Sequence, residues 1–281
     1  MGKRKREVDL VILSDIHLGT YGCHSEELLK YLKTIKPRHL ILNGDIIDMW
    51  QFSKRYWPAS HMQVVKHIMG LLAKGTRVTY LTGNHDEMLR KFAGFKLGNF
   101  RIANKKVLQL NGKRAWVFHG DVFDVTMRYS KWLARLGAIG YDMLILINTF
   151  VNFILKVFGR GKISLSRKVK DSVKQAVKFI NDFERTAAEI AVSNEYDFVV
   201  CGHIHHPEMK NVVTDNGQVV YLNSGDWVEN LTALEYHGGE WRIYRYHSDP
   251  FAQAQKINKR YRSQLDNEEI FKDLVNEFLR K

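Results

Sequence analysis

Five short apolar runs in this chain each stop at a polar turn that contains Asp, Asn or His. The runs cover residues 8–13, 40–42, 78–81, 115–118 and 196–200. Helical patterns, with apolar residues three and four positions apart, lie at 26–35 and 61–72. Strands that alternate with helices predict an α/β fold with a sheet buried on both faces. Functional groups in such sheets collect at the carboxyl ends of the strands, so we expect the polar turns to meet there.

The turns themselves supply the candidate site residues. In chain order they read Asp15-Ile16-His17, Gly44-Asp45-Ile46-Ile47-Asp48, Gly83-Asn84-His85-Asp86, His119-Gly120-Asp121 and Gly202-His203-Ile204-His205. Each turn alone is a weak signal, because a polar pair in a loop is usually structural or solvated. Together they are specific, since carboxylate, amide and imidazole groups are the ligands that divalent metals such as Mn, Fe and Zn accept.

The middle of the chain has a different pattern. Residues 125–195 contain no proline and predict two helices, at 128–158 and 166–191. The stretch 143–158 is apolar almost all round, but its sixteen residues fall short of the roughly twenty that a membrane-spanning helix needs. A spanning helix, a buried helix and a lid or membrane-facing surface all remain open, with the span least favoured. We expect 125–195 to form a helical cap or lid inserted into a core made of 1–124 and 196–281.

Further strands are expected after the fifth run. The runs 219–222, 231–236 and 241–246 have strand character, and Gly238-Gly239 is a hairpin signal between the last two. We expect them to be antiparallel and to form or extend a second sheet. An amphipathic helix is expected at 266–279.

Cysteine content and the start of the chain bear on location. The two cysteines, Cys23 and Cys201, form no C-x-x-C pair, so neither a disulfide framework nor a thiolate zinc site is indicated. The basic start Met1-Gly-Lys-Arg-Lys-Arg-Glu precedes an apolar run that is short and contains Asp9, unlike a secretory signal. These features favour a reducing compartment and a mature cytoplasmic N-terminus.

Positive charge is concentrated in one region. The formal charge of the chain is +13, and residues 54–114 contain thirteen Lys or Arg against two acids, Asp86 and Glu87. A positive surface of this kind attracts nucleic acid, anionic lipid headgroups or phosphorylated small molecules, or is merely solvated. No recognised nucleic-acid module accompanies it, so we expect no specific nucleic-acid partner.

The order of the five turns resembles that of the calcineurin-like metallophosphoesterases, over nearly the whole chain outside 125–195. The resemblance implies an α/β, four-layer α/β/β/α sandwich of two mixed sheets with a helical cap. It also implies two divalent ions bridged by Asp45. The ligands it assigns to the first ion are Asp15, His17 and His205, and those it assigns to the second are Asn84, His119 and His203.

Charge balance fits a phosphate substrate. Two divalent ions bring four positive charges, while Asp15 and Asp45 are the only carboxylates in this ligand set and a bridging hydroxide removes one more. The neutral amide of Asn84 keeps the site positive. Manganese is the expected metal by resemblance, with Fe or Zn as alternatives. The mechanism implied is attack of the metal-bridging hydroxide on phosphorus.

The remaining polar residues of the turns are given other roles. We expect His85 to stabilise or protonate the leaving group and Asp86 to orient His85. Asp48, Asp121 and Asp124 are expected to support ligands or turns rather than bind metal. His206 is expected to be solvated or at the rim of the site.

One branch of the superfamily is most similar, namely the UDP-2,3-diacylglucosamine hydrolases of lipid A biosynthesis. The similarity lies in Asp15-Ile16-His17-Leu18, in His119-Gly120-Asp121 and in the helical insertion. It implies an apolar cap that receives acyl chains, at the cytoplasmic face of the inner membrane. Substrate contacts would come from Asn84 and His85 and from basic residues of the cap, among them Arg167, Lys168, Lys170, Lys174 and Lys178.

Three functions remain open at this point. The first is a membrane-associated pyrophosphatase that cleaves UDP-2,3-diacylglucosamine or a related lipid precursor and releases UMP. The second is a broader phosphodiesterase or phosphatase that acts on nucleotides, nucleic acid or other phosphoesters. It is favoured by His85, which stands where that branch usually has arginine and which suits a poorer, alkoxide leaving group. The third is an inactive scaffold, which the complete set of seven ligand positions disfavours.

Overall fold

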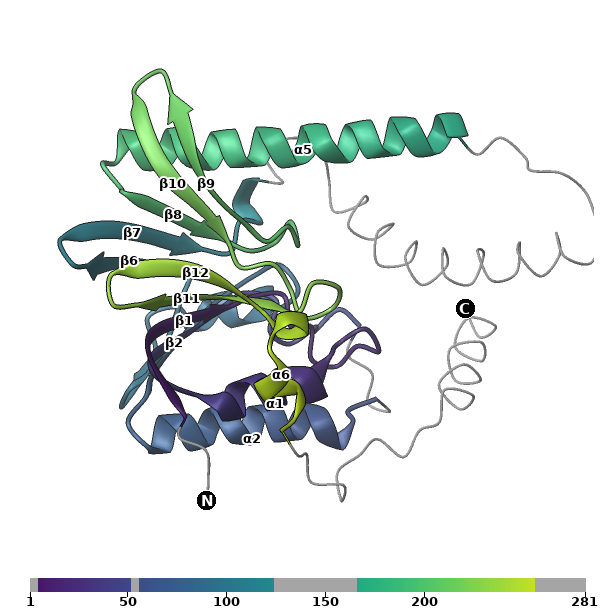
Figure 1. Cartoon of the computed structure of the whole chain (residues 1–281), viewed down its shortest axis with the longest axis vertical. Coiled ribbons are helices and arrows are strands. Elements are labelled where there is room, and N and C mark those ends of the chain that lie inside the picture. Colours follow the sequence, from purple (N-terminus) through teal and green to yellow (C-terminus); the bar gives the residue numbers. More distant parts are fainter. Residues whose placement is uncertain (1–4, 52–55, 124–165, 256–281) are drawn as a thin grey trace, which may run out of the picture.

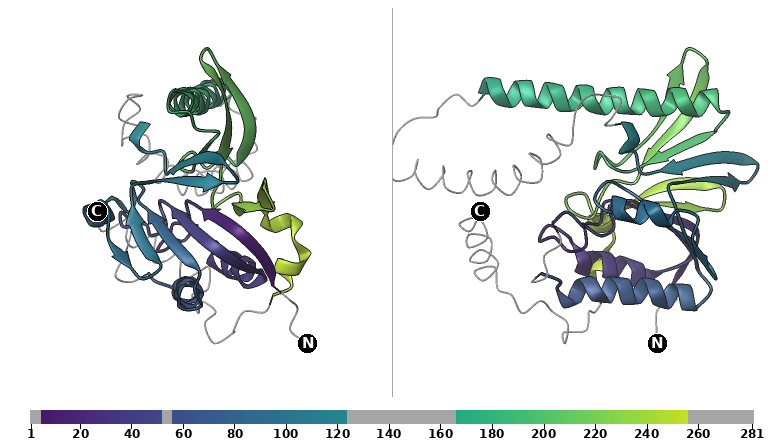
Figure 2. Two further views of the ribbon diagram at one scale, coloured as in Figure 1. Left: turned by 90° about the vertical axis from the view of Figure 1, so that its left-hand side faces the viewer. Right: turned by 180° about the vertical axis from the view of Figure 1, so that it is seen from behind.

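The computed structural model describes residues 5–51, 56–123 and 166–255, with side chains from residue 178 onward in the last range. Two sheets pack face to face, and helices cover their outer faces (Figures 1 and 2). The layers, in order, are α5, a five-stranded sheet, a seven-stranded sheet, and the pair α1 and α2. The expected four-layer α/β/β/α architecture with two mixed sheets is confirmed.

The seven-stranded sheet has the order β12-β11-β1-β2-β3-β5-β4. Its middle strands β1, β2, β3 and β5 are parallel, and β4, β11 and β12 join antiparallel. The strands are β1 (Arg6–Leu13), β2 (Ile35–Asn43), β3 (Arg77–Leu81), β4 (Lys96–Leu97), β5 (Phe100–Ala103), β11 (Thr232–His237) and β12 (Glu240–Arg245).

The five-stranded sheet has the order β6-β7-β8-β10-β9. Strands β7, β8 and β10 are parallel, and antiparallel strands close both edges. The strands are β6 (Lys105–Leu110), β7 (Lys113–Phe118), β8 (Phe198–Cys201), β9 (Glu208–Thr214) and β10 (Gly217–Asn223).

The helices bury apolar stripes on the outer faces of the sheets. Helices α1 (Ser25–Thr34) and α2 (Ala59–Ala73) pack together over the seven-stranded sheet, with the short α6 (Pro250–Gln253) against α1. Helix α5 (Ser166–Ser193) contacts β8, β9 and β10 through buried Phe183, Ala187 and Ala191. Two short 3-10 helices complete the described elements, η1 (Glu87–Phe92) and η2 (Tyr246–Ser248).

Several elements differ from expectation. Strand β10 extends the second sheet as expected but runs parallel to β8, while β11 and β12 extend the first sheet beside β1. Strands β4, β5, β6 and β9 were not predicted. The C-terminal half of α5, which falls within the expected insertion 125–195, packs against the five-stranded sheet. The predicted helices at 128–158 and 266–279 lie outside the described residues.

Membrane-spanning helices are absent from the described ranges: none of their helices combines the length and apolar character that crossing a bilayer requires. The apolar stretch 143–158 falls outside those ranges.

Candidate metal centre

The candidate residues follow the carboxyl ends of five parallel strands. Asp15 and His17 come after β1, Asp45 after β2, Asn84 and His85 after β3, His119 after β7, and His203 and His205 after β8. The two sheets meet along this edge, which brings turns that are distant in the chain within contact of each other. The predicted convergence at one edge is therefore what the structure shows.

Asp45 lies at the centre of the group. Its Oδ2 is 3.3 Å from His119 Nε2 and 4.0 Å from the Nε2 atoms of both His17 and His85. Its Oδ1 accepts a hydrogen bond of 2.9 Å from the backbone N–H of His85. One carboxylate thus faces imidazoles that come from three different turns, which is the position a bridging ligand requires.

Three sets of side chains have the spacing of metal ligands. Asp15, His17 and His205 form the first, Asp45, His119 and His203 form the second, and His17, Asp48 and His85 form the third. Within each set the potential ligand atoms all lie within 4.8 Å of one another. The first two sets divide His17 and His205 from His119 and His203, as the family resemblance does. In the third set, Asp48 contacts the Nδ1 atoms of His17 and His85.

Asp15 connects the first set to the strand β8 turn. Its Oδ1 is 3.2 Å from His205 Nε2, and its Oδ2 accepts a hydrogen bond of 3.0 Å from the His203 backbone. Asp15 is completely buried. It therefore fixes both histidines of the Gly202-His203-Ile204-His205 turn relative to β1.

Contacts at Nδ1 orient the imidazole rings of His119 and His17. Nδ1 of His119 is 2.9 Å from the carbonyl oxygen of Asn43, and Nδ1 of His17 is 3.0 Å from Asp48 Oδ2. These contacts fix each ring and leave Nε2 free, as in many metal sites. Nε2 of both rings is buried, and it has no hydrogen-bond partner among the described residues.

The backbone at the candidate ligands is unusual. Asp15, His17, Asp45, His203 and His205 have φ between 51° and 68°, and they make up five of the eight non-glycine residues with positive φ in the described ranges. Left-handed conformations of this kind cost of order 1–3 kcal/mol each and persist where the surrounding structure enforces them. Their concentration here indicates that the turns are shaped for ligand placement rather than for stability.

Two glycines allow the turns to approach each other. A Cβ added at Gly83 would lie 2.2 Å from Asp45 Oδ1, and one added at Gly44 would lie 2.4 Å from the ring of His119. Gly44 also has a φ of +78°. Side chains at either position would displace the groups around Asp45.

Neighbouring histidines lower the pKa of the two candidate carboxylate ligands, Asp15 and Asp45. Burial raises the pKa of Asp15, but the charges of His205 and His119 outweigh it and lower the pKa to about 2. Burial lowers the pKa of His205, and Asp15 outweighs that effect and raises it to about 9. The pKa of Asp45 is likewise lowered, because His119 and His17 outweigh the cost of its burial. The carboxylates are therefore ionised and available as ligands at neutral pH.

The structure corrects the prediction that Asp86 orients His85. The Asp86 carboxylate instead accepts hydrogen bonds from the backbone of Gly83 (2.6 Å) and Ile46 (3.0 Å) and from the Tyr80 hydroxyl (2.6 Å). Asp86 is fully buried and holds the turn that carries Asn84 and His85. The sequence does not reveal this, because the direction of a side chain in a tight turn depends on its tertiary partners.

Asp48, and not Asp86, is the carboxylate that contacts the ring of His85. Its Oδ2 lies 2.8 Å from His85 Nδ1 and 3.0 Å from His17 Nδ1, and its Oδ1 accepts hydrogen bonds from the backbone of Trp50 and Gln51. Asp48 thus supports both rings and its own turn, as expected of a supporting residue. Trp50, whose ring centroid is 4.2 Å from that of His85, was not predicted.

The other predicted residues lie around the centre. Asp121 pairs with Arg90, which also donates to the Gly83 carbonyl at 3.3 Å, so Asp121 supports a turn as expected. His206 is exposed and lies 3.6 Å from Glu208, away from the ligand sets. Asp124 lies outside the described residues.

The predicted basic contacts lie on α5. Lys178 is exposed. The side chains of Arg167, Lys168, Lys170 and Lys174 are not among those described. The N-terminal half of α5 extends past the sheets at the end where β7 finishes, which is the side of the metal centre (Figure 1).

The segment Asn223–Glu229, from the last residue of β10 onward, contacts the turns that carry the candidate ligands. The Asn223 amide donates to the Gly202 carbonyl (2.9 Å), and Ser224 Oγ lies 2.6 Å from Ser14 Oγ. The Trp227 backbone donates to the carbonyl of Asp15 (3.0 Å). The polar sequence Asn-Ser-Gly-Asp was the available signal for this support.

The donor set fits divalent metal ions. Nε2 of His17, Nε2 of His119 and the amide oxygen of Asn84 are buried without hydrogen-bond partners in the described part of the chain. Buried polar atoms are rarely left in this state unless a ligand completes them. Imidazole nitrogens and carboxylate or amide oxygens without thiolate suit Mn, Fe or Zn and do not select among them.

Comparison with known proteins agrees with this chemistry. The calcineurin-like phosphoesterase family model matches residues 9–207. A UDP-2,3-diacylglucosamine hydrolase of Aliivibrio fischeri (strain MJ11) is 21% identical over 249 residues, which cover 86% of this chain and 99% of that protein. The enzyme of the same name from Photorhabdus laumondii subsp. laumondii is 25% identical over 233 residues, or 77% of this chain and 90% of that protein.

Among solved structures, an archaeal phosphodiesterase aligns with a TM-score of 0.39 and 14% identity, covering 84% of this chain and 98% of that chain. The family match spans all five turns and all three sets of clustered side chains. The chain therefore belongs to the calcineurin-like phosphoesterase family and is a metal-dependent phosphoester hydrolase.

Proposed function

We propose that this hydrolase cleaves the pyrophosphate bond of a UDP-linked acylated sugar, UDP-2,3-diacylglucosamine or a related lipid precursor, and releases UMP. The observation that carries the proposal is the extent of the likeness to the Aliivibrio fischeri enzyme, which covers 99% of that protein.

We propose that two divalent ions, manganese by resemblance, occupy the first two ligand sets. Asp15, His17 and His205 would hold the first ion, and Asn84, His119 and His203 the second, with Asp45 between them. Bound ions at such a site supply positive charge to a phosphate group and lower the pKa of water.

The chain's own residues would position the phosphate and the leaving group. His85 Nδ1 lies 2.8 Å from Asp48 Oδ2, and the ring of Trp50 packs against the imidazole. Burial lowers the pKa of His85, but the contact with Asp48 and the charge of Asp45 outweigh it and raise the pKa. A protonated imidazole held in this way would neutralise charge on the leaving oxygen or give it a proton.

The acyl chains would be bound by the segment 125–195. Burial of acyl carbons contributes about 0.8 kcal/mol per CH₂, so an apolar surface would dominate affinity for the lipid. Peripheral contact with the cytoplasmic face of the inner membrane is part of this proposal, because the substrate is delivered from a bilayer.

His85 supports a second candidate, a phosphodiesterase of broader specificity. A phosphate leaving group needs mainly charge neutralisation, whereas an alkoxide needs a proton. The contact of His85 Nδ1 with Asp48 is suited to proton donation from the other ring nitrogen.

The two candidates are separated by measuring UMP release from UDP-2,3-diacylglucosamine in the presence of Mn²⁺, beside hydrolysis of bis(p-nitrophenyl) phosphate. The proposal expects efficient release of UMP and a much higher KM for UDP-N-acetylglucosamine, which lacks the long acyl chains. Turnover of the diester with an inert lipid substrate would establish the second candidate instead. Asp45→Asn serves as the inactive control for both reactions.

A further inference from the structure

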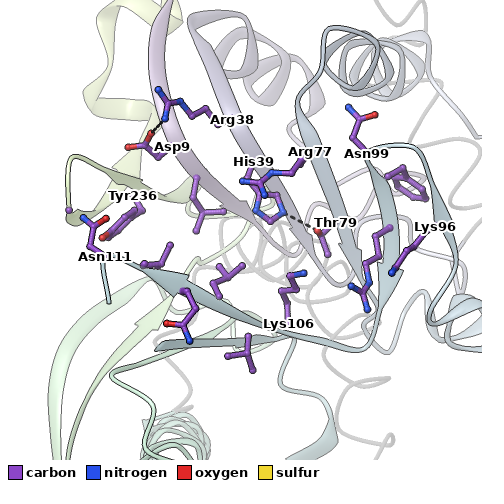
Figure 3. A pocket seen from close by; sticks show the side chains of 18 of the residues that line it. Asp9, Arg38, His39, Arg77, Thr79, Lys96, Asn99, Lys106, Asn111 and Tyr236 are labelled. Atoms are coloured by element: carbon purple, nitrogen blue, oxygen red, sulfur yellow. Dashed lines mark hydrogen bonds and ion pairs between the residues drawn. The ribbon is translucent and has the colours of Figure 1, made fainter. Parts of the chain in front are cut away.

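A basic cavity separates the two sheets at the end opposite the metal centre. Its volume is about 1040 Å³, and Figure 3 shows side chains of both sheets pointing into it. Arg77 and Phe100 line it and are the first residues of β3 and β5, whereas the metal centre follows the last residues of the strands. None of the seven candidate metal ligands lines this cavity.

Strand register places polar side chains on the inner face of the seven-stranded sheet. His39 pairs with Leu10, and Thr79 pairs with Ile41. Leu10 and Ile41 belong to the apolar core between the sheets. Because residues directly opposite each other on neighbouring strands share a face, His39 and Thr79 also face the second sheet. They are hydrogen-bonded to each other at 2.9 Å.

The same strand register places Arg and Lys side chains beside His39 and Thr79. Arg77 is opposite His39, and Arg101 is opposite Thr79 and Lys96. The inner face therefore changes from Leu and Ile at its centre to Arg and Lys toward β4. Arg77 and Lys96 are exposed and Arg101 is half-buried, so the change marks the place where the space between the sheets opens to solvent.

The five-stranded sheet adds another cation from the opposite side. Along β6, Lys106 is half-buried, whereas Lys105 and Val107 are exposed. Leu108, which is two residues further and on the same face as Lys106, belongs to the core between the sheets. Lys106 therefore points inward, toward the cations of the other sheet (Figure 3).

These cations lack an acidic counterpart. Asp9 is the only acid among the described lining residues, and it already lies 3.4 Å from Arg38 and 3.0 Å from His237. Nε of Arg101 is buried and has no hydrogen-bond partner within the described ranges. Solvent reaches this cluster and screens it in part, and an anion held between the four cations would relieve their remaining repulsion.

The titration of the lining groups is consistent with this imbalance. Burial lowers the pKa of Lys106, and repulsion from Arg101, Arg77 and Lys96 lowers it further. Burial lowers the pKa of His39 to about 4, with added repulsion from Arg77 and Lys106. Each group is disfavoured as a cation by its neighbours, so an anion between them would be stabilised by several charges at once.

We propose that this cavity binds a ligand that carries two or more phosphate charges, at a site separate from the metal centre. Arg77 and Arg101 offer planar guanidinium groups that suit phosphate oxygens, and Lys96 and Lys106 add charge from two strands. Phe100, Leu108 and Tyr236 provide apolar surface for an organic part of the ligand. Inorganic pyrophosphate and a nucleoside diphosphate share the required chemistry.

The test is titration of the full, metal-loaded chain with pyrophosphate and with ADP by calorimetry. The wild type should show two classes of site, one at the metal centre and one in the cavity. In the double variant Arg101→Gln, Lys106→Gln, affinity at the second class should fall by at least about tenfold. The matched control Lys105→Gln, next to Lys106 on the other face of β6, should keep both classes. Tighter binding of ADP would assign the site to an organic phosphate, and tighter binding of pyrophosphate to an inorganic one.

Two outcomes would overturn the proposal. The first is a single class of site in the wild type that the double variant retains. The second is a lower melting temperature of the double variant than of the wild type without anion, because removal of like charges should leave it equal or higher. Lys106→Gln alone should also weaken binding at the second class of site. Retained hydrolysis of bis(p-nitrophenyl) phosphate would show that the variants are folded and that the metal centre is intact.

Discussion

Asp45 connects the metal centre more than any other single side chain. It faces the imidazoles of His119, His17 and His85, and it also accepts the backbone N–H of His85. Its own φ of 54° is left-handed. Aspartate in this conformation is strained where a glycine would not be, so the carboxylate rather than the backbone accounts for aspartate at this position.

Asp45→Asn should lose metal and activity together. The amide keeps the size of the side chain but removes the charge that would bridge the ions. Loss of a supporting residue around a metal typically costs 10–100-fold in affinity or activity, so loss of this ligand should cost at least about 100-fold. Metal content by mass spectrometry and hydrolysis of bis(p-nitrophenyl) phosphate measure the two effects. Exposed Asp215→Asn is the control, and full activity of the Asp45 variant would refute the bridging role.

Asp48→Asn should lower activity by roughly 10–100-fold while the fold is retained, since Asp48 contacts the Nδ1 atoms of His17 and His85 and holds both rings in place. Its positioning role is tested by His85→Gln. If Asp48 acts through His85, the double variant should be little slower than the slower single variant, with the loss greatest for esters with poor leaving groups. Fully additive losses in kcat would mean that the two residues act independently.

At the scale of elements, α5 connects the outer layer to the centre. Phe183 is fully buried, and its ring centroid lies 5.4 Å from that of Phe123 and 6.3 Å from that of His203. A Cβ at Gly120 would come within 2.6 Å of the same ring. The helix therefore packs directly behind the His119 and His203 turns, in addition to covering the five-stranded sheet.

Phe183→Ala should destabilise the protein by about 3–5 kcal/mol, the usual cost of an aromatic cavity in a core. The midpoint of urea unfolding measures this effect. Ile190→Ala on the same helix is the control, because Ile190 is 36% exposed and should change stability by no more than about 1 kcal/mol. Equal losses in the two variants would show that Phe183 makes no special contact.

The sequence predicted the long periodic elements and the convergence of the turns well. Strands β1, β3, β7 and β8 and helices α1 and α2 have clear apolar patterns and end in recognisable polar turns. Strands β4 and β5 have only two and four residues, and β6 begins with two lysines and has a glutamine before its last leucine, so no clear apolar run marks these three strands. The pairing of β11 with β1 was missed because register between distant segments depends on the assembled sheet. The sequence analysis also assigned Asp86, and not Asp48, to the ring of His85. The reason is the same, since tertiary contacts decide where a carboxylate points.

At the scale of the whole molecule, Glu235 joins elements from both ends of the chain. This fully buried carboxylate on β11 accepts hydrogen bonds from Arg6 on β1, from the Tyr31 hydroxyl on α1 (2.8 Å) and from Arg242 on β12. Burial raises its pKa, but the contacts with Arg6 and Arg242 outweigh it, so the pKa of Glu235 is lowered on folding.

Glu235→Gln should therefore destabilise the protein at neutral pH, by about 1–3 kcal/mol because both arginines are partly solvated. A lowered pKa in the folded state contributes stability above the unfolded value of about 4.3, and that contribution is lost as the pH falls through the folded value. The difference in unfolding free energy between wild type and variant should be constant from pH 6 to 8 and should shrink in acid. Exposed Glu240→Gln is the control, and a difference that grows in acid would contradict the assignment.

The position of β1 between β2 and β11 has a consequence during synthesis. Strand β1 pairs on one edge with Ile35–Asn43, which follows it closely in the chain, and on its other edge with Thr232–His237, which is synthesised almost two hundred residues later. Until those residues emerge, the nascent chain presents an unpaired strand edge that carries Leu10 and Ile12, a template for wrong pairing. Chaperones that shield such edges would be needed most in this interval, and slow translation between β2 and β11 would lengthen it.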